Sequence, residues 1–87
     1  MRKIKLSGRE AAVVRCIDFT SSTPGLEIRD RTHMDTEDLV DILNGLLDAG
    51  FVETHPISDK VAPEKFDETL FEVNPAYVQE LRVATRR

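Results

Sequence analysis

The spacing of apolar and polar residues along the chain predicts its secondary structure, beginning with a helix over residues 7–19. Ser7 and Glu10 have the spacing of a capping box, in which each side chain bonds the backbone N–H of the other residue. An almost continuous apolar run follows as far as Phe19. We expect a helix with so many apolar residues to lie in the centre of the core.

A short second helix is predicted after the helix-breaking segment SSTPG. Thr23 has the character of an N-cap, and Pro24 suits the first helical position because that position needs no backbone N–H. The helix is expected to run from Pro24 to Thr32, with Leu26 and Ile28 turned inward.

The stretch DTEDLVDILNGLLDAG, residues 35–50, predicts a third helix with one apolar stripe. Asp35 or Thr36 is the expected N-cap, and Gly50 supplies a left-handed stop. Gly45 lies inside the helix, where glycine costs roughly 1 kcal/mol relative to alanine, so we expect a close approach by another helix or a kink there. The residues with i, i+3, i+4, i+7 spacing, expected to be buried, are Leu39, Ile42, Leu43 and Leu46.

Two alternating stretches after the third helix predict a pair of strands, FVETH at 51–55 and TLFEV at 69–73. The connection between them contains two prolines and is long for so small a domain, which indicates a functional or a mobile loop. Asn74 and Pro75 then form the cap and first position of a last helix over residues 75–85. The order of elements predicts a mainly α fold with a small β-ribbon.

This order resembles the winged helix-turn-helix of bacterial winged-helix transcriptional regulators, in which three helices are closed by a two-stranded wing. The resemblance covers residues 6–73 and rests on LSGREAAVV, GLEIRDRTHM and DTEDLVDILNGLLDAGFVE as the three helices and the first wing strand. It implies one domain over residues 1–87, with a three-helix core (6–50), a wing (51–73) and an extra C-terminal helix (74–87). Winged helices also serve as protein-binding modules, so the fold does not decide the function.

The charge of the chain is negative and unevenly distributed. The formal net charge is −4, from 12 Lys and Arg against 16 Asp and Glu. Residues 1–33 hold seven bases and four acids, residues 34–72 two bases and eleven acids, and residues 73–87 three bases and one acid. The central region, at −9, therefore bears on which partner the surface attracts.

The resemblance implies that the third helix would enter the major groove of DNA with the face opposite its apolar stripe. Thr36 and Asn44 suit base contacts there, and Asn44 has the groups to pair with adenine. Glu37 and Asp41, one turn apart, would be repelled by the phosphates. The candidate DNA-binding residues of the whole chain are Arg29, Arg31, Thr36, Val40, Asn44, Lys60 and Lys65.

The same outward face favours an alternative function, the docking of a protein. Val40 and Leu47 lie seven residues apart on it, and acidic residues border them. A structural explanation is also open, in which the long loop or the last helix folds over this apolar strip. The candidate protein-binding residues are Glu37, Val40, Asp41, Leu47 and Asp48.

The basic residues outside the third helix have two interpretations each. Arg29 and Arg31 would hold phosphates, or would pair with neighbouring acids on a solvated face. Lys60 and Lys65 would follow a groove from the wing, or would be solvated among its acids. Arg2, Lys3 and Lys5 would form a basic arm, or would simply be solvated. Arg82, Arg86 and Arg87 would bind nucleic acid, or would complement the C-terminal end of the last helix.

The last helix lies beyond the minimal winged fold. Its apolar stripe would pair with a second copy in an isologous homodimer, or would pack against the first helix of its own chain. The candidate dimerisation residues are Tyr77, Val78, Leu81 and Ala84.

The sequence offers no set of residues for catalysis, for a metal ion or for a cofactor. Cys16 is the one cysteine, and His33 and His55 are isolated. No apolar run approaches the roughly 20 residues needed to span a bilayer, and the basic N-terminus lacks an apolar region, so a cytoplasmic location is expected. We therefore expect a non-enzymatic regulatory protein that binds DNA as a transcriptional regulator, or alternatively a module that binds a protein.

Overall fold

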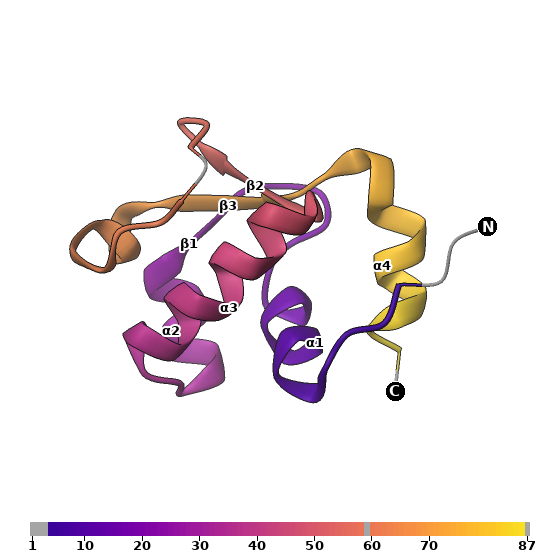
Figure 1. The fold of residues 1–87 in the computed structure, drawn as a ribbon, viewed down its shortest axis with the longest axis horizontal. Helices are drawn as coiled ribbons and strands as arrows, with labels where there is room; N and C mark the ends of the chain where they lie inside the picture. Colours follow the sequence, from indigo (N-terminus) through magenta and orange to yellow (C-terminus); the bar gives the residue numbers. More distant parts are fainter. Residues whose placement is uncertain (1–3, 59, 87) are drawn as a thin grey trace.

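The secondary-structure elements follow one another in the order α1, β1, α2, α3, β2, η1, β3, η2 and α4, where η marks a short 3-10 helix (Figure 1). The computed structural model describes residues 4–58 and 60–86. The fold is α+β, with helices and a three-stranded antiparallel sheet. In this part of the chain, no helix combines the length and apolar character that crossing a membrane requires.

The first helix, α1 (Gly8–Arg15), begins at the predicted capping box. The Ser7 hydroxyl accepts a hydrogen bond from the Glu10 N–H at 3.1 Å, and the Glu10 carboxylate accepts one from the Ser7 N–H at 2.8 Å. Both reciprocal bonds of the box are therefore present, and this prediction is confirmed.

The turn after α1 starts earlier than the predicted end at Phe19, because side chains bond the backbone there. The Thr23 hydroxyl accepts from the Asp18 N–H at 3.0 Å, and the Asp18 carboxylate accepts from the Thr20 N–H at 2.8 Å. Such local bonds offer the backbone an alternative to the helical pattern. Ile17 lies in this turn and is still buried.

The second predicted helix is preceded by a strand that the sequence analysis missed. β1 (Thr23–Pro24) pairs with β3 (Leu70–Val73), so that Thr23 lies opposite Phe71. The prediction of Thr23 as an N-cap is wrong, because its hydroxyl is used in the turn before β1. α2 (Gly25–Thr32) follows directly.

Only one of the two apolar residues predicted to face inward from α2 is buried. Ile28 is fully buried, whereas Leu26 is 44% exposed. Two residues two positions apart lie about 200° apart around a helix, so they cannot both face the same core. α2 ends at His33, which has a left-handed φ of 58°.

The third helix, α3 (Thr36–Ala49), has the predicted ends, with Asp35 at the N-cap position and Gly50 at a left-handed φ of 84°. A Cβ at Gly45 would meet nothing within 4 Å, so the expected close approach of another helix at this position is wrong. Ile42 is half-buried. The other residues predicted for the apolar stripe are fully buried, namely Leu39, Leu43 and Leu46.

The sheet has the strand order β1-β3-β2, so β3 is central and β2 (Val52–His55) forms an edge. β2 and β3 coincide closely with the two predicted strands. Their antiparallel register places Val52 opposite Val73 and His55 opposite Leu70. The side chains of β2 alternate between buried and exposed, as the alternating sequence predicts.

The long connection between β2 and β3 is anchored by the 3-10 helix η1 (Pro63–Glu68), in which Phe66 is fully buried. η1 contacts both α2 and α3. It lies so close to α2 that a Cβ at Gly25 would be 2.1 Å from the Phe66 carbonyl oxygen. Gly25 also donates its N–H to the Thr69 carbonyl oxygen at 2.9 Å. The connection is therefore fixed against the helices at η1.

The chain ends in η2 (Pro75–Tyr77) and α4 (Val78–Ala84), which lie at the opposite end of the protein from η1 (Figure 1). The predicted cap is confirmed, since the Asn74 carboxamide oxygen accepts from the Ala76 N–H at 3.0 Å. The Asn74 amide group also donates to the Gly50 carbonyl oxygen at 2.7 Å, which joins the start of η2 to the end of α3.

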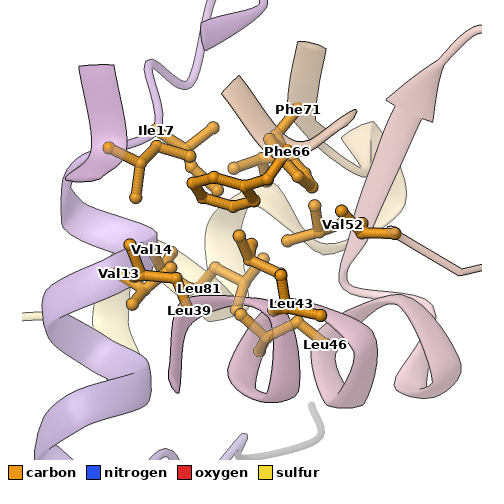
Figure 2. Close-up of a cluster of buried hydrophobic side chains, with 14 residues drawn as sticks. Val13, Val14, Ile17, Leu39, Leu43, Leu46, Val52, Phe66, Phe71 and Leu81 are labelled. Atoms are coloured by element: carbon orange, nitrogen blue, oxygen red, sulfur yellow. The ribbon is translucent and has the colours of Figure 1, made fainter. Parts of the chain in front are cut away.

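One hydrophobic cluster holds these elements together. Figure 2 shows Phe66 of η1 and Phe71 of β3 side by side in it, and their ring centroids are 5.8 Å apart. The cluster also receives side chains from α1, α3, β2 and α4, namely Val13, Val14, Leu39, Leu43, Leu46, Val52 and Leu81.

Candidate functional site

The outward face of α3 is the candidate site, and the segment after β2 covers part of it. Val40 is only 6% exposed and belongs to the same hydrophobic cluster as Val61 and Phe66. The prediction that Val40 faces solvent is wrong, because α3 packs against α1 and also against η1. The structural explanation that the long loop folds over this face is therefore confirmed for Val40.

The two polar residues expected to contact bases are engaged within the chain. The Asn44 carboxamide oxygen accepts a hydrogen bond from the Val61 N–H at 2.8 Å. The Thr36 hydroxyl accepts one from the Arg29 guanidinium at 3.0 Å. Leu47 is half-buried and packs against the hydrophobic cluster. Asn44 therefore holds the segment after β2 in place, and its oxygen is not free for a base.

The two arginines of α2 form ion pairs. Arg29 makes a two-pronged contact with Asp67 of η1, at 2.5 and 2.9 Å. Arg31 contacts Glu27 on its own helix at 2.7 Å and donates to the Cys16 carbonyl oxygen at 3.2 Å. The predicted pairing with neighbouring acids is confirmed for Glu27, whereas Asp67, 38 positions from Arg29, is an unpredicted partner.

The exposed side of α3 is acidic. Glu37, Asp41 and Asp48 are all exposed on it, and we call these three residues the acidic face of α3. Asp38 lies beside them and pairs with Arg9 at 3.1 Å. Glu37 complements the positive end of the helix dipole, but Asp41 in the middle and Asp48 near the C-terminal end do not. The helix itself therefore explains only part of this charge.

The two lysines of the connection between β2 and β3 are exposed and line one hollow. Lys60 and Lys65 border a cavity of about 630 Å³ between β2 and η1, together with the acids Glu64 and Glu68. His55 also lines this hollow and contacts the Glu72 carboxylate on the neighbouring strand. The two lysines therefore lie among acids, as the sequence predicts for this connection.

The apolar stripe of the last helix is used inside the chain. Leu81 is fully buried, and the Tyr77 ring meets the Phe51 ring edge-on with centroids 5.2 Å apart. Val78 packs against the hydrophobic cluster, and Ala84 is half-buried. Of the two alternatives for this stripe, packing within the chain is the one that holds for Leu81, which α4 places in the core.

The basic residues near the ends of the chain are only partly within the described structure. Arg2, Lys3 and Arg87 lie outside the described residues. Lys5 and Arg86 are exposed, and the Arg82 guanidinium lies 5.2 Å from the centre of the Phe19 ring.

The one cysteine lies in a notch between α1 and α2. Cys16, Arg15 and Arg31 line this notch, which measures about 310 Å³. Burial raises the pKa of the Cys16 thiol above its ordinary value, and the two nearby arginines oppose that change. The Arg15 guanidinium also donates to the Thr85 carbonyl oxygen at 3.2 Å, and Arg31 caps the end of α1. Both arginines therefore serve the carbonyl ends of helices.

The structure describes no centre that would bind a metal ion. The described residues contain no group of three or more His, Cys, Asp or Glu side chains placed to hold one. His33 serves as the left-handed end of α2.

The residues that fix η1 on the helices are not predicted from the sequence. Asp67, Phe66 and Val61 lie in the long connection between the two predicted strands. One signal was present, because Phe66 is an aromatic residue three positions after a proline in an otherwise charged segment.

Comparison with protein-family models, with curated proteins and with solved structures finds no match to this chain.

Proposed function

We propose that the protein is a winged-helix domain that docks a protein partner through the acidic face of α3. The order of elements supports the fold, since three helices are followed by two antiparallel strands with a long connection between them. In this proposal β2, β3 and their connection form the wing, and β1 widens the expected two-stranded ribbon to three strands.

One observation supports a protein partner over DNA. The side chains of α3 that would contact bases are engaged in contacts within the chain. Val40 is buried, Asn44 holds Val61, and Thr36 holds Arg29. The side chains that stay exposed on α3 include acids, and duplex DNA carries about one negative charge per 1.7 Å. A basic surface on a protein complements these acids and would be attracted to them.

DNA binding is a second candidate, and the wing supports it. Lys60 and Lys65 are exposed at the hollow between β2 and η1. Neither lysine forms an ion pair within the described residues. Two lysines on a wing would hold phosphates without reading bases, so this binding would be sensitive to salt and indifferent to sequence.

Titration with random-sequence duplex DNA separates the two candidates. The purified chain is titrated at about 50 mM and about 200 mM salt, and binding is followed by fluorescence anisotropy of labelled DNA. We expect no binding up to about 100 µM protein at either salt concentration, the weak end of the usual non-specific range. Micromolar binding at low salt that weakens steeply at high salt would replace the proposal with DNA binding.

Capture from a lysate of the source organism tests the protein partner directly. The variant Glu37→Lys with Asp41→Lys reverses the charge of the acidic face. The matched control, Asp30→Lys with Glu64→Lys, makes the same charge change at exposed residues elsewhere. We expect the wild type and the control to capture the same protein and the acidic-face variant to lose it. Equal capture by all three chains would contradict docking through this face.

A further inference from the structure

The hollow between β2 and η1 has the dimensions of a small-molecule site. Its volume of about 630 Å³ lies within the range of roughly 300–1,000 Å³ that is usual for ligand pockets. The notch at Cys16, at about 310 Å³, is smaller. We therefore ask which ligand the side chains that line this hollow would recognise.

The described parts of its wall are held in place by contacts within the chain. The Thr54 hydroxyl accepts from the Ser58 N–H at 2.9 Å and donates to the Pro56 carbonyl oxygen at 3.0 Å, which shapes the turn after β2. The Val61 N–H donates to the Asn44 carboxamide oxygen at 2.8 Å, and η1 packs on α2 and α3. A wall that is already ordered would lose little conformational freedom when a ligand binds.

Four charged side chains of the described lining are exposed, two of each sign. They are the bases Lys60 and Lys65 and the acids Glu64 and Glu68. Within the described residues, none of these four side chains takes part in an ion pair. A simple anion would meet the two glutamates and a simple cation the two lysines, whereas a ligand that carries both charges would pair with both.

The rest of the described lining is apolar or already engaged. Pro56, Val61 and Ala62 supply apolar surface, and Val61 belongs to the hydrophobic cluster. The other polar side chains of the lining make contacts within the chain, namely Thr54, His55, Ser58 and Thr69. Apolar surface with a few placed polar groups is the usual composition of a small-molecule site.

We propose that this hollow binds a free α-amino acid with an apolar side chain. The carboxylate of the ligand would pair with the two lysines, and its ammonium group would pair with the two glutamates. Its side chain would lie against the apolar surface of Pro56, Val61 and Ala62. This inference goes beyond the docking of a protein, and it uses residues other than the acidic face of α3.

A DNA phosphate fits the hollow less well than such a zwitterion. The two lysines attract both ligands, but Glu64 and Glu68 line the same space. A phosphate that approached the lysines would also approach these carboxylates, and like charges repel each other. The ammonium group of an amino acid turns the same two carboxylates into favourable partners.

The test titrates the full chain, labelled with ¹⁵N, with L-leucine. The amide signals to follow are those of Val61, Ala62 and Lys65, which line the hollow. We expect saturable shifts of these signals with a Kd of about 1 mM or tighter, within the affinity per atom that is usual for ligands of this size. Three comparison compounds, isocaproate, isoamylamine and glycine, lack the amino group, the carboxylate and the apolar side chain respectively. Each should bind at least about threefold more weakly, since an exposed ion pair and a small apolar contact both contribute modestly.

Removal of the basic charges tests the carboxylate contact. Lys60→Gln with Lys65→Gln should weaken L-leucine binding by roughly three- to tenfold and should not weaken isoamylamine binding, because that compound has no carboxylate. The matched control, Lys5→Gln with Arg86→Gln, removes two exposed basic charges outside the hollow and should leave L-leucine binding unchanged.

Removal of the acidic charges tests the ammonium contact. Glu64→Gln with Glu68→Gln should weaken L-leucine binding by roughly three- to tenfold and should not weaken isocaproate binding. The matched control, Asp30→Asn with Glu37→Gln, removes two exposed acidic charges elsewhere and should leave L-leucine binding unchanged. Because this control alters the acidic face of α3, amino-acid binding and partner capture can fail separately.

Three results would overturn the inference. The first is the absence of saturable shifts up to about 50 mM L-leucine, far above the expected Kd. The second is binding of isocaproate or isoamylamine as strong as that of L-leucine, which would indicate a site for a simple anion or a simple cation. The third is L-leucine binding that neither the lysine nor the glutamate variant weakens, which would place the ligand elsewhere.

Discussion

Replacement of Gly25 by alanine tests how closely η1 packs on α2. A Cβ at this position would lie 2.1 Å from the Phe66 carbonyl oxygen and 2.9 Å from its carbonyl carbon. Close carbon–oxygen contacts in proteins are about 3.3–3.6 Å, so one backbone must retreat by more than about 1 Å. The obstacle is backbone, which cannot turn aside as a flexible side chain would.

The magnitude follows from what would have to move. Phe66 is fully buried, so a retreat of η1 would disturb its packing against Phe71. Overpacking of a well-packed site typically costs about 1–3 kcal/mol, and occasionally more. We expect Gly25→Ala to lower the free energy of unfolding by about 3 kcal/mol. A loss of this size is a large part of the roughly 5–15 kcal/mol that stabilises a typical domain.

Gly45 provides the matched control, because a Cβ there would meet nothing within 4 Å. Gly45→Ala should raise the free energy of unfolding by about 0.5–1 kcal/mol through better helix propensity. Urea denaturation followed by circular dichroism measures both variants. If Gly25→Ala cost less than about 1 kcal/mol while Gly45→Ala stabilised as expected, the close packing of η1 on α2 would be refuted.

Two further predictions concern Asn44 and Cys16. Asn44→Ala leaves the Val61 N–H without its partner, so it should cost about 1–3 kcal/mol and speed hydrogen exchange of the Val61 amide; unchanged exchange would argue against the bond. Because burial raises the pKa of Cys16, alkylation of the thiol by iodoacetamide should have a midpoint at higher pH in the folded than in the urea-unfolded chain. The contribution of the protonated thiol to stability should be lost as the pH rises through the folded-state pKa. An equal or lower midpoint would contradict this.

The helix ends were predictable because they depend on neighbouring residues. Ser7 and Glu10 form their box within one turn, and Asn74 caps the residue two positions later. Gly50 takes the left-handed conformation that ends α3. Each of these features follows from the chemistry of a few consecutive side chains, which the sequence contains directly.

The exposed face of α3 was harder to predict because two other parts of the chain, α1 and η1, pack against this helix. Apolar residues occupy positions 39, 40, 42, 43, 46 and 47, a band too wide for a single contact. The i, i+3, i+4, i+7 pattern places one stripe in the core and leaves Val40 outside it. The second of these, η1, is held in the core by Phe66, which lies 26 positions after Val40 in the chain. β1 likewise forms by pairing with β3, which is distant in the sequence. Periodicity within one segment does not contain such long-range contacts.

Contact of α2 with DNA phosphates and contact of α3 with bases would require different changes in this structure. Phosphate binding by Arg29 needs the displacement of Asp67 and competes with the bond to Thr36, and exposed ion pairs such as Arg29–Asp67 contribute about 0.2–1 kcal/mol. Base contact by Val40 or Asn44 needs the segment after β2 to leave α3. That departure would break the Asn44–Val61 bond and bring Phe66 toward water, and exposing a buried phenylalanine costs about 1.5–3 kcal/mol. A duplex would therefore gain salt-dependent phosphate contacts well before it gained sequence readout. For this reason the salt series with random-sequence DNA decides more than a search for an operator would.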